Sequence, residues 1–126
     1  MKKIFSFLIG AIMLIGFNSC KKNLSVTEDN IVGKWEMTAM IVDGHSSPAD
    51  GQIWELTKDH LVYQYSGYNR EKVEAGEWRL ESKKLYLDFI PWPMTVAKLT
   101  SKTLKLEAYD DEENILMFSY TFDKVK

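Results

Sequence analysis

The amino-acid sequence predicts an all-β domain, an eight-stranded antiparallel up-and-down barrel, that follows a cleaved signal peptide. Three observations support this fold class. Short runs of alternating apolar residues recur about every ten to twelve residues, turn residues separate them, and no segment has the apolar periodicity of an amphipathic helix. Such a meander usually closes into a barrel, because closure removes both exposed edge strands. A two-sheet sandwich is the main alternative, since the same strand spacing permits it.

Three strands are expected in the first half of the domain. The first covers residues 32–42, and its apolar face contains Trp35, Met37, Ala39 and Ile41. Residues 53–57 and 60–66 flank a turn at Lys58-Asp59, and their apolar faces contain Trp54, Leu56, Leu61, Tyr63 and Tyr65. The connection over residues 43–51 is rich in Gly, Ser, Asp and Pro, and the charged stretch 67–75 is expected to be exposed.

Five strands are expected in the second half, at residues 76–81, 84–89, 94–99, 102–109 and 115–122. Their apolar faces contain Trp78, Leu80, Leu85, Leu87, Phe89, Leu104, Leu106, Ala108, Leu116, Phe118, Tyr120 and Phe122. Pro91 and Pro93 interrupt the pattern between the second and third of these strands, because proline cannot donate to a sheet ladder. An acidic loop over residues 110–114 precedes the last strand.

The amino terminus has the layout of an exported precursor. Lys2 and Lys3 precede an apolar run of about 14 residues, which is shorter than the roughly 20 that span a bilayer as a helix. The ending Phe17-Asn18-Ser19-Cys20 resembles the cleavage region of bacterial lipoprotein precursors, which implies lipidation of Cys20. The predicted organisation is therefore a signal peptide over 1–19, the lipidated cysteine and a flexible tether over 20–30, and the barrel domain over 31–126. A buried hydrophobic helix and a conventional secretory signal are the alternatives.

Charge and cysteine content exclude several classes of function. The formal charge is −2, and the mature domain has no basic patch or Lys/Arg run, so nucleic-acid binding has no electrostatic support. The only cysteine is Cys20, so neither an intramolecular disulfide nor a cysteine-based metal site can form.

Several short motifs together resemble a known family. Gly33 and Trp35 form a Gly-x-Trp signature that resembles lipocalins, in which the tryptophan packs across the closed end of the barrel. The remaining pieces are similar to the small lipocalin-like domains of Bacteroidota lipoproteins: Trp54/Leu56, Lys58/Asp59, Gly76/Trp78/Leu80 and Leu99/Thr100/Leu104/Leu106. The chain is shorter than secreted lipocalins, lacks their disulfides, and has no clear C-terminal helix or arginine that would pack on Trp35.

No catalytic constellation is found, so the chain is not expected to be an enzyme. His45 and His60 have no second ligand at a metal-like spacing, and Ser46 and Ser47 lack a nucleophile-elbow pattern. The acidic run at residues 110–113 lacks the EF-hand pattern and is interpreted as a solvated hairpin rather than a Ca²⁺ site. No cofactor and no metal are predicted.

The aromatic and aliphatic interior is the candidate ligand site. The residues expected to face inward are Trp54, Tyr63, Trp78, Leu87, Leu106, Phe118 and Tyr120. These side chains either enclose space for a small hydrophobic ligand or simply fill the core. Trp92, between two prolines, belongs either to a ligand or partner surface or to a plug at the barrel end.

Two functions follow from these expectations. The first is an envelope lipoprotein, held at the membrane by a lipid on Cys20, that binds a small hydrophobic molecule. The second is a protein-interaction module, an accessory subunit or inhibitor, that uses Trp92 or residues 43–51. Surface export of Bacteroidota lipoproteins resembles a process guided by acidic residues after the cysteine. Because Lys21, Lys22 and Asn23 are not acidic, the expected location is the periplasmic side of the outer membrane.

Overall fold

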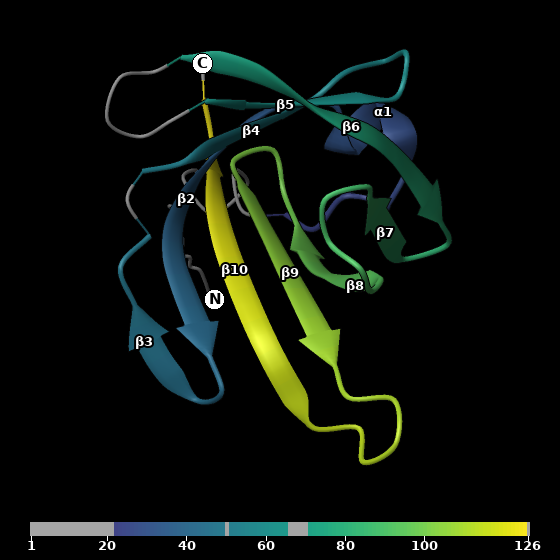
Figure 1. Ribbon diagram of the computed structural model, residues 1–126. Helices are drawn as coiled ribbons and strands as arrows, with labels where there is room; N and C mark the ends of the chain where they lie inside the picture. Colours follow the sequence, from purple (N-terminus) through teal and green to yellow (C-terminus); the bar gives the residue numbers. More distant parts are fainter. Residues whose placement is uncertain (1–21, 50, 66–70, 126) are drawn as a thin grey trace, which may run out of the picture.

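The computed structural model describes residues 22–49, 51–65 and 71–125, which form one nearly all-β barrel with a single short helix among the described residues. Figure 1 shows the elements, which in chain order are α1 (Glu28–Ile31), β2 (Gly33–Val42), β3 (His45–Ser47), β4 (Ile53–Leu56), β5 (Leu61–Tyr65), β6 (Lys72–Glu81), β7 (Lys84–Leu87), β8 (Met94–Leu99), β9 (Thr103–Tyr109) and β10 (Leu116–Lys124). In the part of the chain that is described, no helix is long and apolar enough to cross a membrane.

Eight antiparallel strands close the barrel, as the sequence predicts. Apart from the short β3, which pairs only with β2, each strand pairs with the next one along the chain. β10 returns to pair with β2, from Phe118 opposite Val42 to Lys124 opposite Trp35. Closure removes the edges, so this arrangement is a barrel and not a two-sheet sandwich.

The structure contains one strand that the sequence did not predict, β3, and a longer β6 than predicted. β3 lies inside the connection predicted over residues 43–51, where Asp43 (φ 52°) and Gly44 (φ 81°) form a tight hairpin turn that returns the chain onto β2. β6 begins at Lys72, within the stretch predicted to be exposed, and pairs first with β5 and then with β7. Its residues 72–74 are exposed although they belong to the sheet, and this includes the apolar side chain of Val73.

β-Bulges change which residues face the interior. In β2 the alternation holds at Trp35 and Met37, but Thr38 is an extra residue relative to β10. The following side chains therefore change sides: Met40 packs against the core, whereas Ile41 is exposed. The predicted shared face of Trp35, Met37, Ala39 and Ile41 is thus wrong beyond Met37.

The segment before the barrel is part of the folded domain. The sequence predicts a flexible tether through residue 30, but within the described residues the Leu24 N–H donates to the Leu99 carbonyl at 2.8 Å, and Leu24 and Val26 pack against the core. Thr27 caps α1 by accepting from the Asn30 N–H, and Ile31 at the end of the helix is fully buried. The structure therefore differs from the predicted tether, and the predicted start at residue 31 is later than the start of the folded unit.

Trp35 lies at the closed end of the barrel, held from two sides. Its indole Nε1–H donates to the Ile31 carbonyl at 2.9 Å, and Lys124 Nζ lies 4.5 Å from its ring centroid while donating to the Val32 carbonyl at 3.1 Å. Gly33 has φ +145°, and a Cβ there would come within 2.6 Å of Lys124 Nζ. The glycine of the Gly-x-Trp signature thus leaves room for Lys124 to pack on Trp35. Sequence reasoning found no arginine for that position and did not identify the lysine.

Candidate functional site

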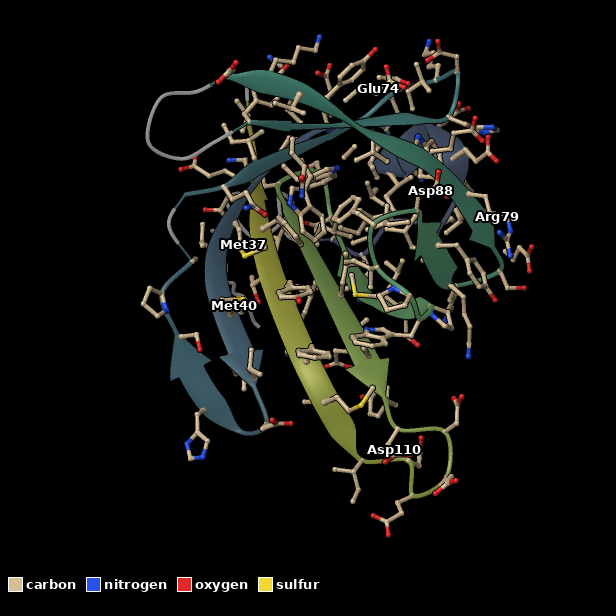
Figure 2. All side chains as sticks on the ribbon, viewed as in Figure 1. Met37, Met40, Glu74, Arg79, Asp88 and Asp110 are labelled. Atoms are coloured by element: carbon tan, nitrogen blue, oxygen red, sulfur yellow. The ribbon has the colours of Figure 1, made fainter. Side chains whose placement is uncertain are left out.

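The connection between β7 and β8, residues 88–93, folds across the open end of the barrel. We call it the β7–β8 segment. Asp88 fixes its start: the Asp88 N–H donates to the Glu77 carbonyl at 3.1 Å, and Asp88 Oδ2 accepts from the Glu77 N–H at 2.8 Å. Gly76 (φ +124°) makes this approach possible, because a Cβ there would lie 2.6 Å from Asp88 Cβ. Figure 2 shows Asp88 beside β6, away from Asp110 at the far end of β9.

Phe89 carries the β7–β8 segment into the interior. Its ring meets Trp54 edge-on, with centroids 5.2 Å apart, and Ile90 also packs against the core. Trp54 comes from β4, and its indole N–H donates to Gln52 Oε1 at 2.6 Å. Side chains of the segment therefore occupy space inside the barrel mouth, as a plug would. The sequence prediction that Phe89 ends a strand is wrong, because the strand stops at Leu87.

A row of aromatic rings connects the core with the rim of the barrel. We call it the aromatic row; it runs through Phe122, Tyr120, Phe118 and Trp92. Phe122 is fully buried, whereas Trp92 has 37% of its surface exposed. Trp92 stacks on Phe118 with centroids 5.3 Å apart and planes only 6° from parallel. One face of Trp92 is thus covered by Phe118, while part of the side chain remains open to solvent.

Two open grooves flank the exposed end of this row. The mouth groove has a volume of about 530 Å³ and is lined by Lys84, Trp92, Pro93, Thr95, Tyr109, Asp110, Asp111, Glu112, Asn114 and Met117. The second groove, of about 360 Å³, lies along β6 and β7 and shares Trp92 and Pro93 with the first. Ligand pockets typically combine apolar walls with a few polar groups. In the mouth groove the apolar part is limited to the surroundings of Trp92, Pro93 and Met117, and the rest of the rim is polar and charged.

Tyr120 is the polar member of the aromatic row. Desolvation by its surroundings raises the pKa of its phenol above the ordinary value of 10.0, so the hydroxyl is neutral at physiological pH. A neutral phenol both donates and accepts hydrogen bonds. Tyr120 itself lines neither of the two grooves described above.

The predicted interior residues separate into three groups. Trp54, Trp78, Leu87 and Leu106 are buried in the core. Phe118 and Tyr120 are partly buried and pack against it, so these two are nearest to the rim. Tyr63 lies on the outer face of β5, opposite Glu55 and under Lys72 Nζ at 4.3 Å, and the predicted interior position is wrong.

The residues considered for chemistry do not converge. His60 Nε2 lies 2.9 Å from Glu28 Oε1, and its ring meets Trp78 edge-on, so it fastens α1 to the barrel. His45 is exposed on β3. Within the described ranges, no group of three His, Cys, Asp or Glu side chains is placed to hold a metal ion. Asp110 Oδ1 accepts from the Glu112 N–H, a contact that stabilises the hairpin.

Sequence reasoning did not identify Phe89 and Met117 as site residues, nor Met40 as a residue that packs against the core. Met40 comes inward only because of the bulge at Thr38, and Met117 lines the mouth groove as the extra residue of a second bulge, between Leu116 and Phe118. Neither bulge has a sequence signal as clear as a proline. The two prolines around Trp92 do mark the irregular segment. They are the sequence signal from which Phe89 could have been assigned to that segment instead of to a strand.

Comparison with known proteins gives one match. A family model described as a lipocalin-like domain matches residues 31–106, from the end of α1 into β9. No curated protein and no solved structure matches the chain significantly. The matched region contains Gly33 and Trp35 at the closed end and the whole β7–β8 segment at the mouth.

Proposed function

Because this chain belongs to the lipocalin-like domain family, we propose that it is a binding protein that holds a small hydrophobic molecule against Trp92 at the open end of its barrel. The observation that carries the proposal is the aromatic row, which ends at a partly exposed indole between two grooves. A flat or chain-like apolar group gains buried area against Trp92 and Met117. The polar end of the same molecule then faces Lys84 or the acidic rim.

Deeper entry requires the β7–β8 segment to move. Phe89 occupies the space beside Trp54, so a ligand that reaches Tyr120 has to displace Phe89 and break the stack of Trp92 on Phe118. The segment is held by the hydrogen bonds of Asp88, by the Ile90 N–H, which donates to the Leu87 carbonyl at 3.0 Å, and by the packing of Phe89 and Ile90 on the core, so deeper entry has to break some of these contacts. Binding against Trp92 and binding inside the barrel are then two stages of one event.

Native mass spectrometry of protein purified gently from its host is the first test, because a co-purifying small molecule would be weighed directly. Titration with a hydrophobic fluorescent probe is the second. Trp92→Ala is expected to weaken probe binding about tenfold, the effect of losing one aromatic contact worth roughly 1.4 kcal/mol.

Val73→Ala is the matched control, since Val73 is 55% exposed on β6 and lines neither groove. Trp92→Phe, which retains a ring, is expected to recover most of the binding. Equal probe affinity in wild type and Trp92→Ala would disprove the proposed site, and absence of any bound molecule or probe would disprove the function.

The proposal includes the cell envelope as the place of action. Its support is the sequence: the short apolar run, Ser19 before Cys20, and the absence of acidic residues directly after Cys20. A lipid on Cys20 would anchor the protein on the periplasmic side of an outer membrane, in a bacterium of the Bacteroidota type. The mass of the amino-terminal peptide and protease protection in intact cells test the anchor and the side, respectively.

A second candidate function is protein interaction through the same rim. Trp92 and Pro93 lie side by side between two open grooves, and exposed tryptophans are frequent anchors at protein interfaces. A photo-crosslinking residue at position 92 would capture such a partner in cells, and the same residue at the exposed position 115 serves as the control. A bound small molecule with no crosslinked protein would favour the first function.

A further inference from the structure

The amino-terminal segment borders a separate groove on the outside of the barrel. This groove of about 240 Å³ lies between residues 23–26, Lys83 and the second half of β8. The Leu24 N–H donates to the Leu99 carbonyl, so the segment is fixed along the groove by a backbone hydrogen bond. Leu24 is therefore fixed relative to β8.

The charge of this face is positive. Two of the described residues that line the groove are charged, and both are lysines with exposed side chains, Lys83 and Lys98. Lys22, which is also exposed, directly precedes the lining residue Asn23. Lys98 lies opposite Lys105 in the β8–β9 register, which extends the basic surface, although Lys105 Nζ is 3.6 Å from Glu107. We call the face formed by Lys22, Lys83 and Lys98 the basic groove face.

The opposite sign of charge lies at the other end of β9. The hairpin that follows Tyr109 carries Asp110, Asp111, Glu112 and Glu113. It is separated from the turn after Leu99 by the length of β9, about 20 Å at roughly 3.3 Å per residue. Figure 1 shows this hairpin at the far end of β9 and β10 from the turn between β8 and β9.

We propose that the basic groove face lies against an anionic lipid surface and orients the barrel on the membrane. This inference rests on the anchor at Cys20 included in the proposed function. Only two residues, Lys21 and Lys22, separate Cys20 from Asn23, so three residue-to-residue steps limit the span between them to about 10 Å. This short link keeps the basic groove face near the headgroups, whose attraction for lysines decays over a Debye length of roughly 8 Å, while the acidic hairpin is repelled from the same surface.

The proposed orientation has a functional consequence. The acidic hairpin forms part of the mouth groove, so the rim around Trp92 is held on the aqueous side of the protein. A ligand would then reach Trp92 from the aqueous phase or from a soluble carrier, and not directly from the bilayer to which the protein is attached.

The test uses the full chain, processed in a host that lipidates such precursors and reconstituted into vesicles. Because Cys20 is the only cysteine, one introduced cysteine gives a unique label. A fluorophore at Ala97→Cys, beside the groove, is compared with one at Asp111→Cys, on the acidic hairpin. Lipids that carry a spin label on the headgroup are expected to quench the first strongly and the second weakly.

Charge supplies the matched control. Vesicles of phosphatidylcholine alone are compared with phosphatidylcholine mixed with phosphatidylglycerol. The Lys83→Glu/Lys98→Glu protein is expected to lose the extra quenching at position 97 that phosphatidylglycerol causes. Each lysine changes the equilibrium ratio of docked to undocked orientations by roughly fivefold. Lys72→Glu, at the opposite end of β6 from Lys83, is expected to retain it.

Equal quenching at positions 97 and 111, or stronger quenching at 111, would overturn the inference, as would an unchanged signal in the double variant. Failure of the anchor is a separate result, because mass spectrometry would then find Cys20 free. Free Cys20 coupled to a maleimide lipid gives the same attachment point. With an azide-bearing residue in place of cysteine at position 97 or 111, the fluorophore is attached by separate chemistry, and the comparison of the two positions then tests the orientation by itself.

Discussion

Lys124 joins the two ends of the domain through a single side chain. It comes from the last strand, crosses Gly33 on the first, and covers Trp35 while donating to the Val32 carbonyl. Desolvation lowers the pKa of its ammonium below the ordinary value of 10.5. Sequence reasoning missed this contact because no local pattern relates a lysine near the end of the chain to a tryptophan in the first strand.

The pKa of Lys124 predicts a pH dependence of stability. The unfolded chain holds this proton more tightly than the folded protein, so the free energy of unfolding gains a contribution as pH rises through the lowered pKa towards 10.5. Urea unfolding of wild type and of Lys124→Met, which keeps most of the aliphatic stem, measures it as a difference. Between neutral and alkaline pH, the free energy of unfolding of wild type is expected to rise relative to that of the variant. A constant difference between the two free energies over that range would contradict the prediction.

The position of Tyr63 shows what alternation alone does not determine. Tyr63 and Tyr65 do share one face of β5, as the pattern indicates, but that face is the outer one: Tyr65 donates to Glu55 at 2.7 Å, and Lys72 lies over both rings. The interior position belongs to Val62, which is fully buried. A tyrosine has an apolar ring and a polar tip, so both faces accept it, and period-two spacing cannot choose between them.

At the scale of elements, irregular backbone explains most differences from the sequence prediction. Strand existence and order follow from alternation and turn residues, and all eight barrel strands were predicted. Bulges at Thr38, Ala75, Ala97 and Met117 reset the alternation, and they depend on how two strands fit together. The Asp43-Gly44 hairpin signal was present in the sequence, whereas nothing there relates Asp88 to the Gly76–Glu77 backbone.

Asp88→Ala is expected to release the β7–β8 segment. It removes the acceptor of the Glu77 N–H, which costs about 1 kcal/mol of unfolding free energy. Loss of this attachment should also separate Trp92 from Phe118 and increase binding of a hydrophobic probe in the mouth. Denaturant unfolding and ring-current shifts in NMR spectra measure the two effects.

Glu113→Ala, an exposed acid on the far hairpin, is the control for Asp88→Ala and should change neither quantity. Gly76→Ala is expected to act on the same segment from the other side, because its Cβ would meet Asp88. If Asp88→Ala left the Trp92 and Phe118 shifts unchanged, the segment would be held by its apolar contacts instead.

At the scale of the whole molecule, the barrel wall is uneven. β10 pairs with β2 and β9 along nearly its whole length, whereas β7 and β8 pair only at Lys84–Thr95 and Leu85–Met94. Local opening should start where pairing is shortest. Native-state hydrogen exchange is therefore expected to be fastest for amides of β7 and β8 among the barrel strands, and slowest for those of β2, β9 and β10. Uniform protection around the barrel would show that the interior packing, and not the strand pairing, sets local stability.

The sequence therefore predicts the architecture better than the site. An eight-stranded barrel with Trp35 at one end requires only the period of apolar residues and the Gly-x-Trp motif, both of which are local. The rim requires Trp92 of a folded-back segment to meet Phe118 of the last strand, and Phe89 of the same segment to meet Trp54 of β4. Such proximity depends on closure and bulge placement, which no single segment encodes.

Pairing of the last strand with the first also has a consequence for the timing of folding. The chain leaves a ribosome or a translocation pore with β2 early and β10 late, so β2 lacks its β10 partner, and Trp35 lacks Lys124, until synthesis is nearly complete. Contacts between such distant residues close slowly, and the waiting intermediate exposes an unpaired edge. During that interval the nascent protein is most exposed to aggregation and depends most on chaperones.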